Sequence, residues 1–156
     1  MQKITPFLWF DGDAEEAAQF YTSVFEDSKI VTVTRYSEAG PRPAGSVMTI
    51  VFHICGQEFI ALNGGPQYKF TPAVSFVVSC QTQAEIDRYW DRLVEGGRPV
   101  QCGWLTDKFG LSWQIVPAAI GQMLQDKDAE RRKRVMQAVF SMVKLDIAEL
   151  QRAYNG

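Results

Sequence analysis

The sequence predicts an α+β protein built from two β-α-β-β-β modules that form a curved mixed sheet around a cleft, followed by a long C-terminal helix. Three observations predict this fold. Short runs of β-branched and aromatic residues alternate in polarity, as half-buried strands do. Two stretches with apolar residues three and four positions apart are typical of amphipathic helices. The order of these elements begins again after the Asn-Gly-Gly-Pro segment at 63–66.

The first module is expected in residues 1–65. A strand over 4–10 ends at an Asp-Gly-Asp turn, where Asp13 is a typical N-cap for a helix over 14–25. Three further strands are expected over residues 30–36, 46–54 and 58–63. A loop containing two prolines separates the first two of these strands, and a short turn with one glycine joins the last two.

The second module is expected in residues 66–120 and starts with a strand over 73–79. Thr82 and Glu85 have the spacing of a capping box at the start of the next helix, and a Gly-Gly pair ends that helix. Two strands, joined by an Asp-Lys-Phe-Gly turn, are expected over residues 100–105 and 111–116.

A C-terminal helical extension is expected in residues 121–156, as part of one folded unit with both modules. A short helix covers 118–125, and Asp128 caps a long helix that runs to about residue 153. The apolar stripe of that helix is longer than the edge of a small sheet usually buries. Two interpretations stay open: the helix covers its own sheet, or part of it packs on a second subunit.

Charge and hydropathy exclude some functions. The net charge of −2 and the pI near 5.4 give no field that would attract nucleic acid. The basic run 131–134 is flanked by acidic residues and is interpreted as a solvated helix face. No segment approaches the roughly 20 apolar residues of a membrane span, and no signal peptide is evident. We therefore expect a cytoplasmic protein with no nucleic-acid or membrane partner.

The three cysteines, Cys55, Cys80 and Cys102, have no paired spacing. This pattern argues against a disulfide framework or a zinc ribbon and predicts buried, reduced thiols. Cys102 is the one candidate for a reactive thiol.

Gln114 is the polar residue in the apolar strand at 112–116. Alternation places it on the face of Ser112 and Val116, opposite Trp113 and Ile115. If that face lines a cavity, Gln114 is a site residue. If it does not, Gln114 is an amide at a partly exposed position in a sheet.

His53 is the single histidine of the chain and lies in a predicted strand. It shares a strand face with Thr49 and Val51, which is the more polar of the two faces. Its titration near neutral pH makes it the candidate general acid or base if that face lines the cleft. The alternative is a structural or solvent-facing histidine.

Several motifs carry a resemblance to a known family. They are PFLWFDGDAEEAAQFYTSVF, ALNGGPQYKF followed by SFVV and TQAEID, CGWLTDKFGLSWQIVP, and the closing KRVMQAVFSMVKLDIAEL. With these motifs, which span residues 2–153, the chain resembles the PhnB-like branch of the vicinal oxygen chelate superfamily, a branch often labelled 3-demethylubiquinone-9 3-methyltransferase. The resemblance implies two modules whose sheets curve into a cleft, and assembly as a homodimer.

The resemblance also implies positions for a metal. Catalytic members usually hold a divalent ion with four ligands, typically His and Glu, and these positions fall on Pro6, Ala61, Ala73 and Gln114. Three of these side chains cannot ligate a metal, and a single amide oxygen is a poor anchor for one. We therefore expect no metal and no other cofactor.

The resulting expectation is a protein that binds a small, partly apolar molecule in an aromatic cleft. The candidate ligand-binding residues are Phe7, Trp9, Asn63, Ser75, Trp104 and Gln114, with Phe70 and Trp113 as further aromatic surface. One alternative is an enzyme of unknown reaction, a lyase, isomerase or transferase, that uses His53 or Tyr21. Another is a dimeric scaffold without a site.

The sequence does not favour the methyltransferase activity in the family label. Adenosylmethionine enzymes of the Rossmann type need a glycine-rich turn between a strand and a helix. The first such turn here has a single glycine between two acidic residues, and Gly64 and Gly65 precede a proline and a loop.

Overall fold

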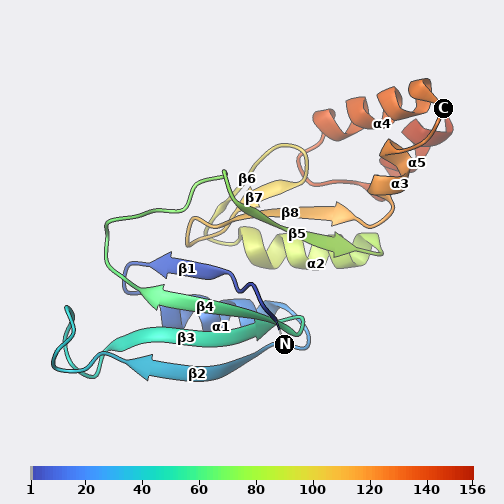
Figure 1. Cartoon of the computed structure of the whole chain (residues 1–156). Helices are drawn as coiled ribbons and strands as arrows, with labels where there is room; N and C mark the ends of the chain where they lie inside the picture. The colour runs from blue at the N-terminus through green and yellow to red at the C-terminus, as the bar shows by residue number, and fades with distance from the viewer. Residues whose placement is uncertain (1) are drawn as a thin grey trace. The chain divides into compact units, whose positions relative to one another are not determined.

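The chain folds into two compact units, the first ending at Phe70 and the second running from Thr71 to Gly156. A computed structural model describes residues 2–156. Each unit contains a four-stranded mixed sheet with helices, as Figure 1 shows. The predicted α+β class with two β-α-β-β-β modules is confirmed. The segment 66–70 belongs to the first unit, where Tyr68 packs on Trp9 and Phe70 packs on Phe10.

The first unit follows the predicted order. Its elements are β1 (Phe7–Phe10), α1 (Ala14–Val24), β2 (Lys29–Arg35), β3 (Val47–Ile54) and β4 (Gln57–Asn63). The sheet order is β1-β4-β3-β2, with β1 parallel to β4 and the other neighbours antiparallel. The expected strand over 4–10 is shorter in the structure, since β1 begins only at Phe7.

Helix α1 covers one face of this sheet (Figure 1). Its buried residues recur at helical spacing and are Ala14, Ala17, Ala18, Tyr21 and Val24. Ile50 and Phe52 of β3 point to the same side and are fully buried. The ring of Tyr21 stacks on the ring of Phe52 with centroids 6.4 Å apart. The apolar residues of the helix recur every 3.6 residues and those of the strand every second residue, and the two sets pack against each other in one core layer.

The start of α1 is capped by an unexpected residue. Asp13 occupies the N-cap position, but its side chain makes no capping hydrogen bond. The N–H of Ala14 instead donates to Oδ1 of Asn63, at 2.9 Å. Burial, with smaller contributions from Glu16 and Asp11, raises the pKa of Asp13 above its ordinary value. A neutral amide therefore ties the helix to the end of β4 where a carboxylate was expected.

The second unit also has the predicted β-α-β-β-β order of elements, although its strand Arg98–Pro99 lies outside the expected strand ranges. Its elements are β5 (Ser75–Cys80), α2 (Gln83–Val94), β6 (Arg98–Pro99), β7 (Trp104–Thr106) and β8 (Ser112–Pro117). The sheet order is β5-β8-β7-β6, with β5 parallel to β8. The predicted cap of α2 is confirmed: the N–H of Glu85 donates to Oγ1 of Thr82 at 3.1 Å. The carboxylate of Glu85 accepts from the N–H of Gln81, one residue before the cap.

The expected strand over 100–105 is wrong in its first half. Cys102 and Gly103 have positive φ angles of 63° and 84°, which end any strand there. Their N–H groups donate to the carbonyls of Met142 and Val143, at 2.9 and 2.8 Å. A Cβ added at Gly103 would lie 3.0 Å from the side chain of Leu145. The C-terminal segment therefore sets this backbone, which local alternation could not reveal.

The predicted long C-terminal helix is wrong, because the chain breaks it. The helices are α3 (Ile120–Leu124), α4 (Ala129–Ser141) and α5 (Ile147–Asn155). Asp128 caps α4 as predicted, and Asp146 starts α5 by accepting from the N–H of Glu149. In the part of the chain that the structure describes, no helix has the length and apolar character needed to cross a membrane.

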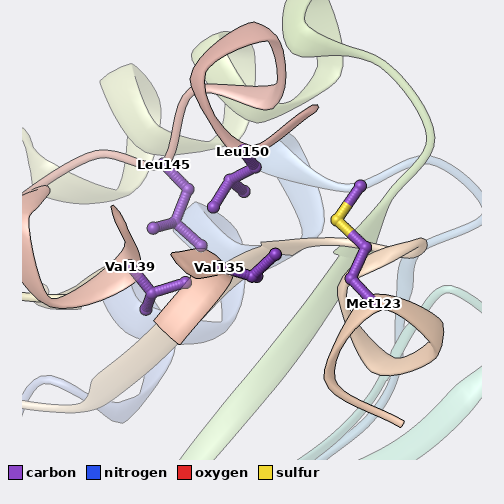
Figure 2. Packing of buried hydrophobic residues seen from close by; sticks show 5 residues of the cluster. All are labelled: Met123, Val135, Val139, Leu145 and Leu150. Carbon is purple, nitrogen blue, oxygen red and sulfur yellow. The ribbon is translucent and has the colours of Figure 1, made fainter. Parts of the chain in front are cut away.

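The three helices pack around a small core of their own (Figure 2). It consists of Met123, Val135, Val139, Leu145 and Leu150, and Figure 2 shows these side chains gathered between the helices. Tyr154 of α5 donates a hydrogen bond to Oδ2 of Asp126 at 2.5 Å. This hydrogen bond is the main reason that the pKa of Asp126 lies below its ordinary value. Arg134 of α4 also donates to the carbonyls of Ala153 and Tyr154.

The cysteines differ from the expectation of uniformly buried thiols. Cys55 is exposed, Cys80 is buried and Cys102 is intermediate. Cys55 occupies the turn between β3 and β4 with a positive φ of 50°, so its side chain lies outside the alternating strand pattern. Burial, with the negative charge of Glu85 as a further cause, raises the pKa of the Cys80 thiol to about 11.

We predict that an aromatic disulfide reagent at pH 8 modifies Cys55 rapidly and leaves Cys80 unmodified until the protein unfolds. The thiolate is the reactive species, and Cys80 is both shielded and protonated. Absorbance at the wavelength of the released thiol measures both phases. Cys55→Ser should abolish the fast phase and Cys80→Ser should preserve it; a fast phase lost only in Cys80→Ser would contradict the prediction.

Candidate functional site

The sheet of the first unit has one face under α1 and a second face that we call the first open face. Strand register defines it in two rows of paired residues: Phe7, Ile60, Val51 and Thr32, and then Trp9, Leu62, Thr49 and Thr34. All of them have the strand parity opposite to that of the buried Ile50 and Phe52. Phe7 is 55% exposed, so a large aromatic side chain lies uncovered at the edge strand.

Trp9 is fixed in place by the Asn-Gly-Gly-Pro segment. Its indole Nε1–H donates to the carbonyl of Gly65 at 2.8 Å. Gly64 is required beneath the ring, because an added Cβ would lie 2.4 Å from it. The ring of Tyr68 meets Trp9 edge-on with centroids 5.0 Å apart. Trp9 therefore presents a rigid aromatic surface, which the sequence could not distinguish from a mobile one.

A polar row lies next to the aromatic rows. His53 pairs in register with Glu58 and Lys29. His53 Nε2 lies 3.8 Å from Glu58 Oε1, and Thr5 Oγ1 donates to Glu58 Oε2 at 3.4 Å. The predicted parity of His53 with Thr49 and Val51 is confirmed. The imidazole is thus partly exposed beside a carboxylate, at the end of the first open face.

Three other candidates of the first unit lie away from this face. Asn63 is only 6% exposed and has the parity of the helix-covered side. Its amide accepts from Ala14 and donates to the carbonyl of Val47 at 3.1 Å. Tyr21 is fully buried, and Phe70 packs on Phe10 with centroids 5.2 Å apart. The structure therefore does not bring these residues together with Phe7 and Trp9.

The second sheet likewise has an open face, opposite α2. Its central row pairs Val77, Gln114 and Trp104. Gln114 Nε2 donates to Oγ of Ser75 at 3.0 Å, so three predicted site residues, Ser75, Trp104 and Gln114, lie together on this second open face. The predicted parity of Gln114 is confirmed. Trp113 points to the other face and is buried.

A buried carboxylate holds the turn before β8. Asp107 is 2% exposed, and its Oδ1 accepts from the N–H groups of Phe109 and Leu111 at 2.9 and 3.1 Å. Its Oδ2 accepts from the indole N–H of Trp113 at 2.9 Å. The sequence indicated only a turn residue. An aspartate at the first position of such a turn is the available signal, because its side chain can bond the following backbone.

The residues at the superfamily's usual metal positions do not fit a metal. Ala61 is buried and pairs with Leu8 and Ile50 on the helix-covered side. Its open-face neighbours, Ile60 and Leu62, have no donor atoms either. Among residues 2–156, no three His, Cys, Asp or Glu side chains are grouped so that they could hold an ion. Of the four family positions, only Gln114 has a side-chain atom that could coordinate a metal, its amide oxygen.

A cavity of about 290 Å³ lies in the first unit, where β1 and β4 end and β3 begins. It is lined by Gly12, Glu15, Arg42, Pro43, Ser46, Val47 and Asn63. The sequence singled out only Asn63 of this set. The others belong to loops, to the first turn of α1 and to the first residue of β3, and no periodic pattern marks them as sharing a position.

Comparisons with known proteins identify related chains. The family described as 3-demethylubiquinone-9 3-methyltransferase matches residues 2–116. A solved structure described as a putative 3-demethylubiquinone-9 3-methyltransferase, PhnB protein, from Bacillus cereus is 43% identical. The match has a TM-score of 0.69 and covers 75% of this chain and 100% of that one. No match was found among curated proteins.

More distant structures share the fold alone. Protein PA1353 from Pseudomonas aeruginosa is 21% identical with a TM-score of 0.62, and the match covers 75% of this chain and 98% of that one. The fosfomycin resistance protein FosX from Listeria monocytogenes is 14% identical with a TM-score of 0.58, over 80% and 98% of the two chains. The family match ends at residue 116, short of the residue 153 to which the sequence motifs extended the resemblance.

We predict that Asp107→Ala destabilises the protein by about 3 kcal/mol or more, because it leaves three N–H donors without their charged acceptor. Asp107→Asn should recover only part of the loss, since one of its two acceptor oxygens becomes a donor. Urea unfolding followed by tryptophan fluorescence measures both variants. Asp91→Asn, at an exposed position of α2, is the control. Loss below about 1 kcal/mol in Asp107→Ala would contradict this role.

Proposed function

The chain belongs to the 3-demethylubiquinone-9 3-methyltransferase family, the PhnB-like branch of the vicinal oxygen chelate superfamily, and from that premise we propose that it binds a small, partly apolar molecule without the superfamily's usual metal. The observation that carries the proposal is the first open face. There Phe7 and the rigid Trp9 lie in register with Ile60 and Leu62 of β4. Binding sites for small molecules are mostly apolar surfaces with a few placed polar groups.

The second open face, in the other unit, is a separate candidate surface with polar groups of its own. Gln114 uses its amide N–H to bond Ser75, and no hydrogen bond occupies its amide oxygen within residues 2–156. The hydroxyl of Ser75 accepts that bond and keeps its own proton. The acceptor of Gln114 therefore lies between Trp104 and the strongly exposed Val77, and the donor of Ser75 lies beside it on the same face. A ligand carrying a hydroxyl, carbonyl or amide fits this arrangement.

The absence of donor side chains at Pro6, Ala61 and Ala73 supports binding without a metal. Ala61 lies within β4, where its neighbours Ile60 and Leu62 are also apolar. The start of α1 also gives little support for binding of adenosylmethionine. The turn from β1 to α1 has one glycine, and the amide of Asn63 already occupies the first N–H of the helix.

One observation favours an enzyme as the second candidate. His53 and Glu58 form a partly exposed pair at the end of the first open face, with Thr5 bonded to the same carboxylate. An imidazole oriented by a carboxylate is a common arrangement for moving a proton. This candidate is a lyase, isomerase or transferase of unknown reaction in which His53 acts on a molecule held by Phe7 and Trp9.

We predict that 8-anilinonaphthalene-1-sulfonate binds the native protein and that Phe7→Ser weakens binding about tenfold, because the exposed ring is removed. Ile4→Ser is the matched control, an exposed apolar residue outside the strands. Fluorescence titration measures both. A metabolite library is then screened by displacement of this probe and by thermal shift. Equal probe affinity in Phe7→Ser and the native protein would contradict the assignment of the first open face.

The same screen separates the alternatives. Stabilisation by Zn²⁺, Ni²⁺ or Mn²⁺ that is lost in Gln114→Ala would contradict binding without a metal. Micromolar affinity for adenosylmethionine would restore the methyltransferase activity. If a displacing metabolite is converted to product and His53→Gln abolishes that conversion while preserving affinity, the protein is the enzyme of the second candidate.

We also propose a homodimer formed through the C-terminal extension. Met136 and Phe140 lie four residues apart in α4, Val143 lies just beyond its end, and all three are exposed, with Phe140 65% exposed. On α4, Met136 and Phe140 are exposed while Val135 and Val139 belong to the extension's own core. An exposed apolar stripe of this kind is typical of a surface between subunits.

We predict that Phe140→Asp converts a dimer to a monomer, because a charge would be buried in the apolar contact. Sedimentation velocity gives the oligomeric state of both proteins. Gln151→Asp, at an exposed position of α5, is the control and should remain dimeric. A native monomer, or a Phe140→Asp dimer of unchanged affinity, would rule out this interface.

A further inference from the structure

The cavity at the end of the first sheet contains two opposite charges that do not neutralise each other. Arg42 comes from the loop between β2 and β3, and Glu15 from the first turn of α1. Both side chains are partly buried, and within residues 2–156 neither takes part in a hydrogen bond or an ion pair. Opposite charges that line one small cavity without meeting attract a molecule that can contact both.

The position of Arg42 is defined by the backbone beside it. A Cβ added at Gly65 would lie 3.3 Å from Arg42 Nη1. The guanidinium therefore lies over the segment that follows β4, next to Asn63. Its five N–H donors form a planar fork that matches a carboxylate, which is the anion an arginine at the wall of a cavity binds with two parallel bonds.

Another part of the cavity lining, around Glu15, is suited to a cation. Asp11, Asp13 and Glu16 flank Glu15 in sequence, and the pKa of Asp13 is raised by burial and by the charges of Glu16 and Asp11. This accumulation of negative charge repels an anion and favours an ammonium group. Ser46 donates its proton to the carbonyl of Pro43 at 2.6 Å, so toward the cavity its hydroxyl has only acceptor lone pairs.

We propose that this cavity is a binding site for a small zwitterion of the α-amino acid type, with its carboxylate on Arg42 and its ammonium group on Glu15. A volume of about 290 Å³ is at the small end of ligand sites, so it suits an amino acid and not a nucleotide cofactor. Gly12 leaves open space at the cavity wall, because an added Cβ there would meet no atom within 4 Å. Phe7, Trp9, Gln114 and Ser75 do not line the cavity, so the site is independent of the proposed function.

Three probes of matched shape test the requirement for both charges. L-norvaline has both groups, pentanoate lacks the ammonium group, and butylamine lacks the carboxylate. Amide chemical shifts of the full-length ¹⁵N-labelled protein are recorded with each probe up to about 10 mM, a range that detects millimolar affinity. We expect saturable shifts at Gly12, Glu15, Ser46 and Val47 with L-norvaline. With either single-charge probe at the same concentration, the shifts should be at least about tenfold weaker.

Three variants assign the charges, and two further variants serve as controls. Arg42→Gln and Glu15→Gln should each weaken L-norvaline binding about tenfold or more, while Arg42→Lys keeps the charge but loses the planar fork and should recover only part of the affinity. The controls are Glu38→Gln, in the same loop as Arg42, and Lys69→Gln, both at exposed positions outside the cavity. An unchanged amide spectrum elsewhere shows that each variant is folded.

Three outcomes would overturn the proposal. The first is the absence of saturable shifts with L-norvaline. The second is pentanoate binding as tightly as L-norvaline, which would make the cavity a simple anion site. The third is binding that Glu38→Gln weakens as much as Glu15→Gln does, which would indicate a general charge effect. Equal loss in Arg42→Gln and Glu15→Gln, with both controls unchanged, supports the two-point site.

Discussion

The constraint on which the rest depends is that each sheet has a helix against one of its faces. Strand alternation sends Ile50 and Phe52 to the side of α1, and Trp113 and Ile115 to the side of α2. The remaining residues of the same strands are thereby committed to the open faces. A single register therefore fixes both the core and the candidate binding surfaces, and a slip of one residue would exchange them.

Regular periodicity made most of the fold predictable from the sequence. The strands and helices of both modules were found within a few residues because their buried positions repeat at 2 or 3.6 residues. The failures have physical causes that are not local. The strand over 100–105 is interrupted because Cys102 and Gly103 bond to a segment some 40 residues later. The long helix is broken where Asp146, a capping residue, stands inside an otherwise continuous apolar stripe.

Part of the candidate site could also be predicted from the sequence. Parity was sufficient to place Gln114 and His53 on the correct faces of their strands, but it did not decide which aromatic side chains lie on an open face. Parity did not show that the side chain of Asn63 caps α1, because its hydrogen-bond donor, the N–H of Ala14, lies 49 residues earlier in the chain. Arg42 and Glu15 were missed, since a loop and a helix turn are brought together only by the fold.

The two backbone bonds from Cys102 and Gly103 to the C-terminal segment have a consequence for the whole second unit. The family's matched span ends at residue 116, yet the turn between β6 and β7 lies inside that span and obtains its hydrogen-bond acceptors from residues 142 and 143. The extension is therefore a structural part of the module and not a tail appended to it. A shortened chain would have to supply two acceptors from water or refold this turn.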